Sequence, residues 1–305
     1  MSWWVYVPLL LSGVFGLAAP ALAGRLPPWL ATWLLSGGGL LSAAASSASI
    51  ALLAFLLIAQ SPLLVERGHW SDDFLRGHDQ YAAPVGVLAC ALVVVLSVRF
   101  VRAAARRLAA VRDAYRLAAA LPAAGGELCV LNDSAQHAFA VPGRPGRIVV
   151  TTGMLRSLDG GQRRALLAHE RAHLVHRHYL HQSAGTLAVA VNPLLARLPA
   201  ALALSCERWA DEDAAHVCRR VTVASTLTTA STAVAPGSAV VLAAGGADVL
   251  ARIDALHAPA PRLIAWRLAT LAGLLLATGV AVAVAMRDVE RLFELAQSAY
   301  RLGQR

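Results

Sequence analysis

Four long runs of apolar residues dominate the hydrophobic pattern of the chain. They cover residues 3–24, 29–60, 84–101 and 268–286. Each is long enough to cross the hydrocarbon core of a bilayer as an α-helix, which takes about 17–25 residues. The second run exceeds that length, so it must tilt, kink near Gly37–Gly39 or begin outside the core. The pattern predicts a mainly α-helical membrane protein with four transmembrane helices.

The first run raises the question of a cleaved leader. It ends in Ala21-Leu22-Ala23, which resembles a signal-peptidase site. However, only Met1-Ser2 precedes the run, and the first arginine, Arg25, follows it. This charge order is the reverse of that in a secretory signal. We therefore expect a retained transmembrane helix.

Charged residues between the runs orient the predicted helices. The 62–83 loop carries two arginines against four acidic residues. Arginines gather after the third run, at Arg102, Arg106, Arg107, Arg112 and Arg116. Because cytoplasmic segments are enriched in positive charge, this predicts a protein of the cell membrane with both termini extracytoplasmic. The expected parts are a membrane region over 1–103, a cytoplasmic domain over 104–261, the fourth transmembrane helix within 262–286 and an extracytoplasmic tail over 287–305.

Two further apolar stretches compete for membrane status. Residues 184–205 include Arg197 between Pro193 and Pro199. An arginine at mid-bilayer costs at least ~2.5–3.5 kcal/mol and proline interrupts a helix, so we expect a core or interfacial helix. Residues 221–246 are rich in Thr and Ser and contain Pro236-Gly237, which favours a packed helix. Contact with the membrane stays open for both stretches.

Composition supports a membrane protein and excludes other classes. The chain is 57% hydrophobic, and its net charge of +9 comes from arginine alone. The arginines form no patch interleaved with aromatic residues, so we expect no direct nucleic-acid binding. The alanine-rich, lysine-free composition is typical of bacterial sequences with high-GC coding.

None of the four cysteines forms a CxxC pair, and Cys206 and Cys218 lie roughly 18 Å apart along one helix. We expect reduced, buried thiols.

The predicted cytoplasmic domain has an α+β pattern. Residues 104–120 continue the third transmembrane helix as an amphipathic helix. Short strands are expected at Leu128–Leu131, Ala138–Val141 and Arg147–Thr151, with a Pro- and Gly-rich turn over 142–146. Asp159 with Gln162 three residues later forms a capping box for the helix that follows. The sequence predicts a small sheet beside helices.

The helix after that capping box carries the chemistry. It contains His169-Glu170-Arg171-Ala172-His173, and residues four apart lie on one face of a helix. Two imidazoles so placed bind a single Zn²⁺, with the glutamate placed to take a proton from the metal-bound water. Glu207, on a second predicted helix, is the candidate third ligand. Asp211, one turn further, is expected to hydrogen-bond a ligand histidine.

The remaining histidines of this region receive no catalytic role. His176, His178 and His181 follow the motif. A second metal site is one interpretation, but we favour solvated side chains that suit a helix C-terminus. His137 and His216 are expected to be structural. Zinc itself follows from the ligand types, and other divalent ions fit similar sets.

The motifs occur in an order that resembles known membrane peptidases. Ala138–Gly143, then Ile148–Leu155, then the histidine helix, then Glu207–Asp211 are similar to the HtpX-type gluzincin core. Three predicted spans before that core and one after it resemble more closely the BlaR/MecR-type membrane metalloproteases. The resemblance covers roughly residues 80–286.

The resemblance implies roles for individual residues. His169, His173 and Glu207 would bind zinc, and Glu170 would be the catalytic glutamate. The strand containing Phe139, Ala140 and Val141 would pair with an extended substrate. Arg252 would lie near the active site and stabilise the oxyanion. The histidine expected six residues before that arginine is replaced here by Gly246.

The resemblance also implies a function. The chain would be a zinc metalloendopeptidase acting on a protein or peptide, such as a winged-helix repressor of the BlaI/MecI type. HtpX-like quality control of membrane proteins is an alternative, and a non-catalytic membrane receptor or scaffold is another. Relatives that sense β-lactams carry a penicillin-binding domain after the last span, whereas nineteen residues follow it here, too few for such a domain. Any signal would come from a partner, the 62–83 loop or membrane lipid.

Overall fold

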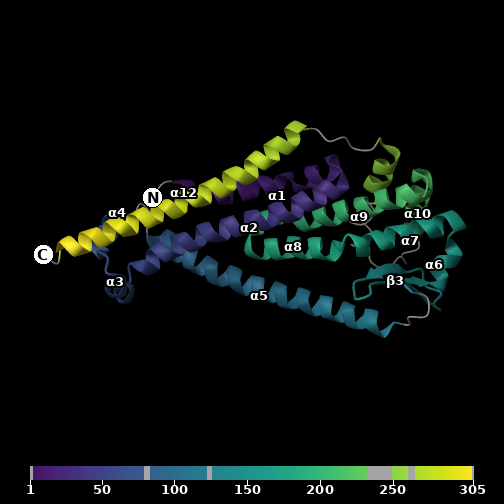
Figure 1. The fold of residues 1–305 in the computed structure, drawn as a ribbon, viewed down its shortest axis with the longest axis horizontal. Coiled ribbons are helices and arrows are strands. Elements are labelled where there is room, and N and C mark those ends of the chain that lie inside the picture. The colour runs from purple at the N-terminus through teal and green to yellow at the C-terminus, as the bar shows by residue number, and fades with distance from the viewer. Residues whose placement is uncertain (1–2, 79–82, 122–125, 233–248, 260–264, 304–305) are drawn as a thin grey trace.

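The computed structural model describes residues 3–78, 83–121, 126–232, 249–259 and 265–303. Long helices run along its length and a small sheet lies at one end (Figure 1). Within the described residues, four helices have the length and composition to cross a membrane: Trp3–Arg25, which joins η1 (Trp3–Tyr6) to α1 (Val7–Arg25), α2 (Pro28–Ala59), α5 (Ala83–Ala120), and Ala272–Leu302 within α12 (Ala265–Gly303). This confirms the predicted mainly α-helical membrane fold.

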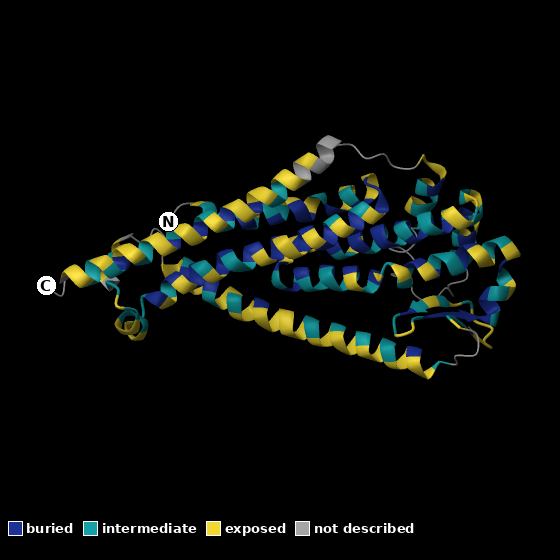
Figure 2. Cartoon of the chain, viewed as in Figure 1, coloured by how far each residue is buried: buried dark blue, intermediate teal, exposed yellow. Residues whose placement is uncertain are grey.

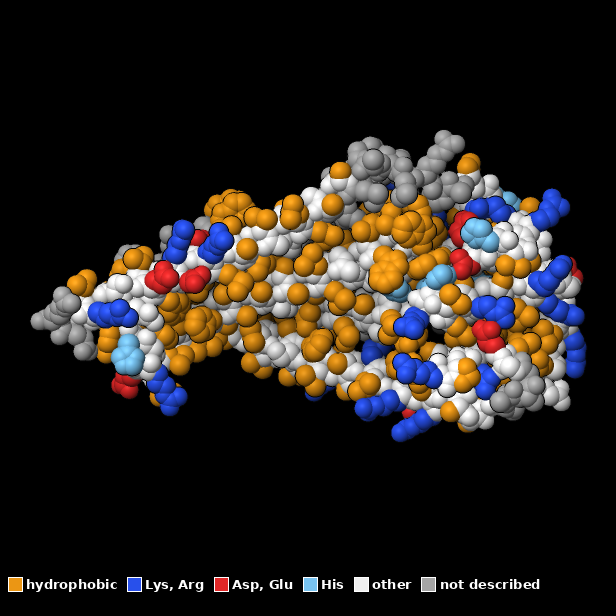
Figure 3. Space-filling model, viewed as in Figure 1, with side chains coloured by type: hydrophobic (Ala, Val, Ile, Leu, Met, Phe, Trp, Pro, Cys, Tyr) orange, Lys and Arg blue, Asp and Glu red, His pale blue; other side chains and the backbone are white. Residues whose placement is uncertain are grey.

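The long helices are arranged around α2, which contacts α1, α5 and α12. The N-terminal end, the short helices α3 (Pro62–Gly68) and α4 (Asp72–His78), and the C-terminal end lie together, opposite the sheet (Figure 1). Exposed residues mark the outer faces of α5 and α12 (Figure 2). Apolar side chains cover the middle of the molecule and charges gather at its two ends (Figure 3). This arrangement is compatible with the predicted orientation. Which end of the molecule faces the cytoplasm stays a prediction.

A helical hairpin from the second half of the chain packs against the first two spans. It consists of α8 (His178–Val191), η2 (Pro193–Leu195) and α9 (Leu198–Val217). At its tip the buried Asn192 amide donates to Ser46 Oγ at 2.9 Å. A Cβ at Gly16 of α1 would overlap the carbonyl oxygen of Leu194. Residues 184–205 are therefore core helix, and their core is shared with the spanning helices.

The sheet has three strands with the predicted bounds: β1 (Leu128–Leu131), β2 (Ala138–Val141) and β3 (Arg147–Thr151). The order is β1-β3-β2, with β3 parallel to β1 and antiparallel to β2. β3 is buried along its length, which explains its β-branched sequence. β2 is an edge strand, and it lies beside α7 (Gly160–Val175).

The helix with the His-Glu-x-x-His sequence begins as predicted. After α6 (Thr152–Ser157), the Asp159 side chain accepts hydrogen bonds from the backbone of Gly161 and Gln162, each at 2.8 Å. Gln162 Oε1 accepts in return from the Asp159 N–H at 3.0 Å. The capping box is therefore confirmed. α7 ends at Val175, and Arg177 adopts a left-handed conformation with φ of 50° that interrupts the helix before α8 begins at His178.

Three further expectations concern the cysteines, the 221–246 stretch and the domain boundaries. The four cysteines are free thiols, as predicted, but only Cys129 and Cys206 are buried, whereas Cys90 and Cys218 are half-buried. α10 (Arg220–Thr232) covers the first part of the 221–246 stretch, and 233–246 lie outside the described residues. The proposed domain boundary at 103/104 falls within the continuous helix α5, and the boundary at 261/262 lies outside the described residues.

Candidate metal centre

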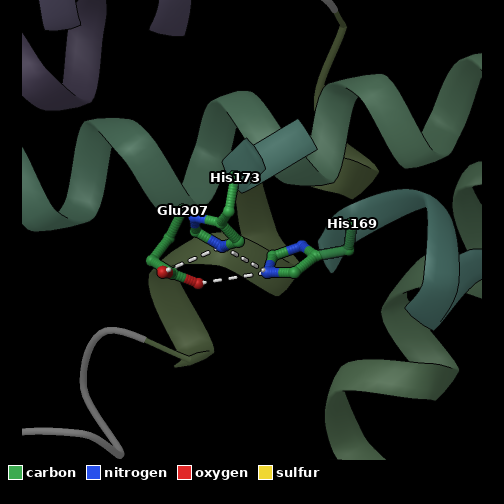
Figure 4. A group of neighbouring side chains, drawn as sticks. All are labelled: His169, His173 and Glu207. Carbon is green, nitrogen blue, oxygen red and sulfur yellow. Dashed lines mark hydrogen bonds and ion pairs between the residues drawn. The ribbon is translucent and has the colours of Figure 1, made fainter. Parts of the chain in front are cut away.

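Three side chains from two helices point toward one another at the end of the bundle that carries the sheet. His169 and His173 come from α7 and Glu207 comes from α9 (Figure 4). The two imidazole Nε2 atoms are 3.1 Å apart. Glu207 Oε2 lies 3.3 Å from Nε2 of His169, and Oε1 lies 3.4 Å from Nε2 of His173. One ligand atom from each residue lies within 4.8 Å of the others. The structure thus brings together the three predicted ligands.

The outer nitrogens of both imidazoles have partners that decide where the protons sit. His169 Nδ1 is 3.0 Å from Asp211 Oδ1, and His173 Nδ1 is 2.9 Å from His178 Nδ1. An Nδ1–H that donates outward leaves the Nε2 lone pair facing inward. Two such lone pairs and a carboxylate repel one another unless a cation lies between them. Neutral imidazole nitrogen with carboxylate oxygen is a donor set that Zn²⁺ takes, so the residues fit the metal.

The electrostatics of the centre also require positive charge there. Burial alone would lower the pKa of His169, but hydrogen bonds with Asp211 and Glu207 outweigh it and raise the pKa to about 10. Burial opposes ionisation of Glu207, yet the His169 hydrogen bond holds the pKa of that carboxyl well below its usual range. Burial lowers the pKa of His173 to about 4.

Glu170 lies beside the three ligands and is buried. Burial raises the pKa of its carboxyl, while the hydrogen bond from the Ala140 backbone N–H acts in the opposite direction. Glu170 lines two cavities, of about 260 Å³ and about 330 Å³, and both also include His169 and Glu207 in their walls. A carboxylate in this position has access to a molecule that enters from either cavity.

Arg252 enters the centre from the helical residues 249–257. Its Nε and Nη2 atoms each donate to the Asp211 carboxylate at 2.7 Å. Its Nη1 atom lies 3.1 Å from Glu207 Oε2. The arginine therefore contacts two carboxylates of the candidate metal centre, and its role in catalysis stays a prediction. Gly246, the position that departs from the family pattern, lies outside the described residues.

The predicted substrate strand runs beside the centre. Ala138 borders both cavities, and Phe139 and Ala140 border the larger one. β2 is an edge strand, and its residues share the wall of the larger cavity with all three candidate metal ligands. Phe139 is 43% exposed, whereas Val141 is 3% exposed and packs beneath the sheet. Of these two side chains, only that of Phe139 is accessible beside the cavity.

Two histidines are buried where the sequence predicts solvated side chains. His178 and His181 were expected to be solvated, but they are only 1% and 7% exposed. Burial lowers the pKa of both imidazoles, that of His178 to about 3. A signal was present, because His178, His181, Gly185 and Ala188 recur at helical spacing and form the buried face of α8. Within the described residues, these histidines do not assemble a second group of three metal ligands.

The fold and the centre together have the features of a metallopeptidase whose helices suit a membrane. A histidine pair one turn apart, a buried glutamate between them and a carboxylate from a second helix are the parts such an enzyme needs. The family profile described as Peptidase family M48 matches residues 102–245. This part of the chain is therefore similar to a gluzincin-type metallopeptidase family, which includes HtpX and is generally zinc-dependent. No curated protein and no solved structure matches the chain.

Proposed function

We propose that the protein is a membrane-embedded, zinc-dependent endopeptidase. His169, His173 and Glu207 would hold the ion, and Glu170 would be the general base. Bound Zn²⁺ supplies Lewis acidity and lowers the pKa of a coordinated water to about 7. The convergence of three electron-pair donors beside a buried glutamate carries this proposal.

The protein residues divide the remaining work. The Glu170 carboxylate takes a proton from the attacking water and returns it to the leaving amine nitrogen. Because burial raises its pKa, Glu170 is a stronger base than an exposed glutamate. Asp211 holds the ring of His169, and Arg252 holds the carboxylates of Asp211 and Glu207. The free edge of β2 offers backbone groups that pair with an extended peptide.

The position of the centre supports a substrate close to the membrane. The residues before and after Glu207 on α9 form hydrogen bonds with the first two spanning helices. Ser205 Oγ lies 3.0 Å from Thr32 Oγ1 near the start of α2, and the Arg208 guanidinium donates to the carbonyl of Ala23 near the end of α1. These span ends lie at the edge of the bundle, so we infer cleavage of cytoplasmic or membrane-proximal segments.

Two biological roles fit this chemistry. The family match favours HtpX-like quality control of membrane proteins, because that family includes HtpX. Cleavage of a BlaI/MecI-type repressor rests on the order of the spans around the domain. A non-catalytic scaffold is disfavoured, because all three ligands and the buried Glu170 are in place. The division into a membrane region, a cytoplasmic peptidase domain, a fourth span and an extracytoplasmic tail is part of this proposal.

The test compares full-length wild type with Glu170→Ala in detergent. Metal content and cleavage are recorded on the same samples, with unfolded casein and a destabilised single-span protein as substrates. We expect equal zinc in both proteins and cleavage by the wild type alone. Zinc absent from both would overturn the metal assignment. Equal cleavage by both would overturn the role of Glu170, and zinc without cleavage of either substrate would favour the scaffold. Preference for the single-span protein would support quality control.

A further inference from the structure

The two histidine ligands have different partners behind them. His169 Nδ1 faces the carboxylate of Asp211, whereas His173 Nδ1 faces the imidazole of His178 at 2.9 Å. His178 is the first residue of α8 and is almost fully buried, although it follows the loop that ends α7. Its ring packs near Trp209, with the ring centroids 5.3 Å apart. A buried imidazole thus lies directly behind a candidate metal ligand.

Proton placement in this pair follows from the chemistry of imidazole. If His173 binds a metal through Nε2, its ring is neutral and its proton sits on Nδ1. His178 Nδ1 must then accept that proton in a hydrogen bond, so the proton of His178 sits on its own Nε2. That Nε2 is buried and has no hydrogen-bond partner among the described residues. Buried donors without partners are rare in proteins and call for an explanation.

The explanation lies in what the other nitrogen does. We propose that His178 is a positioning residue, whose Nδ1 accepts the His173 Nδ1–H and so fixes the ring and tautomer that present Nε2 to the metal. Because Nδ1 of His178 accepts this hydrogen bond, the proton of the His178 ring lies on Nε2, where it has no partner among the described residues. The ring of His178 is almost fully buried, and its Nδ1 lies within hydrogen-bond distance of the His173 Nδ1. This inference rests on the proposed metal centre.

The proposal makes the two ligands unequal. A carboxylate partner increases the basicity of a ligand imidazole and fixes its orientation. A neutral imidazole partner fixes orientation with less increase in basicity, because it carries no charge. Asp211 therefore provides charge and orientation to His169, whereas His178 mainly provides orientation to His173.

Substitutions at residue 178 distinguish the role of His178 as a hydrogen-bond acceptor from its role in packing. His178→Phe keeps a ring of similar size and removes the acceptor. His178→Asn places a side-chain oxygen near the position of Nδ1 and restores the acceptor with a smaller group. The matched control is His181→Phe, one turn further along α8. His181 is also buried, and its Nδ1 lies 2.9 Å from Ser36 Oγ, away from the metal ligands.

The experiment measures zinc affinity of the full-length proteins in detergent by competition with a chelating dye. The Co²⁺-loaded forms are compared by visible absorption, which reports ligand geometry. We expect His178→Phe to lose about 10–100-fold in zinc affinity and to change the Co²⁺ spectrum. His178→Asn should recover most of the affinity, and His181→Phe should match wild type in both measurements.

Two results would overturn the proposal. One is wild-type zinc affinity in His178→Phe. The other is an equal loss in His178→Asn and His178→Phe, which would mean that packing matters and acceptance does not. Thermal unfolding of the metal-free proteins identifies a variant that fails to fold. If His178→Phe fails to fold, the zinc affinity of His178→Asn tests the proposal. A wild type that binds no zinc would overturn the metal centre and this inference together, whereas the variant results concern His178 alone.

Discussion

The two helices that supply metal ligands are held in place by different parts of the molecule. α7 lies beside the edge strand β2 and α10, and its first turn is fixed by its own capping box. α9 packs against α1 and α2, and its first half shares a core with them. The buried residues of that core include Leu198 and Leu202 of α9 with Phe15 and Leu35 of the spans.

This difference shows that the centre has a local part and a tertiary part. The spacing of His169 and His173 is set by the helix that carries both. Glu207 reaches them where α9 packs on α7, and the spanning helices α1 and α2 also pack against α9. The Arg252 contacts with Asp211 and Glu207 tighten the same junction. Metal binding should therefore depend on α1 and α2 even though neither supplies a ligand.

Removal of residues 1–60 is the strongest test of that dependence. The truncated chain keeps the whole His-Glu-x-x-His helix and Glu207. It loses Thr32, the partner of Ser205, and the apolar surface that covers Leu198 and Leu202. We expect zinc binding to fall below detection, measured as metal content after purification. Co-expression of residues 1–60 as a separate chain should restore zinc binding. A truncated chain that retains zinc would contradict the dependence of the centre on α1 and α2.

Substitutions on α9 should give a graded loss of zinc affinity. Asp211→Ala removes the partner of a ligand, a change that typically costs about 10–100-fold in affinity. Glu207→Ala removes a ligand and should cost more. Glu212→Ala is the control, because that side chain pairs with Arg220 at 2.8 Å instead of the metal ligands. Chelator competition measures all three, and an Asp211 effect larger than the Glu207 effect would reverse the proposed roles.

The local part of the molecule was predictable from sequence. The strand bounds, the Asp159 capping box and the i, i+4 histidine pair depend on residues close in the chain. Glu207 was found because it follows the pair on a second helix in a known order of motifs. These features need no knowledge of how distant segments meet.

The tertiary part was not predictable in the same way. Asn192 and Ser46 are 146 residues apart, and helical periodicity names a buried face without naming its partner. The same limit explains His178 and His181, whose polar side chains suggested solvent. Their burial depends on the packing of α8, which begins after the break at Arg177, against α2. The missed features are therefore those in which a spanning helix receives a distant segment.

Close packing between α1 and the hairpin tip can be tested with two glycines of one helix. Gly16→Ala would force its methyl group against the Leu194 backbone, and overpacking of this kind costs about 1–3 kcal/mol. A Cβ at Gly13 meets no atom within 4 Å, so Gly13→Ala should leave stability unchanged or raise it. Thermal unfolding in detergent measures both. Equal midpoints for the two variants would contradict the packing of the hairpin tip on α1.

The smallest effect is expected at the start of α7. Asp159→Ala removes the acceptor for the backbone of Gly161 and Gln162, and loss of such a cap costs about 0.5–2 kcal/mol. The unfolding midpoint should fall, while zinc affinity stays at the wild-type value because His169 lies more than two turns further along the helix. Asp159→Asn keeps an acceptor and should restore most of the stability. A parallel loss of zinc affinity in Asp159→Ala would mean that the histidine pair depends on how α7 begins, and the local half of the centre would then be less independent than its sequence spacing suggests.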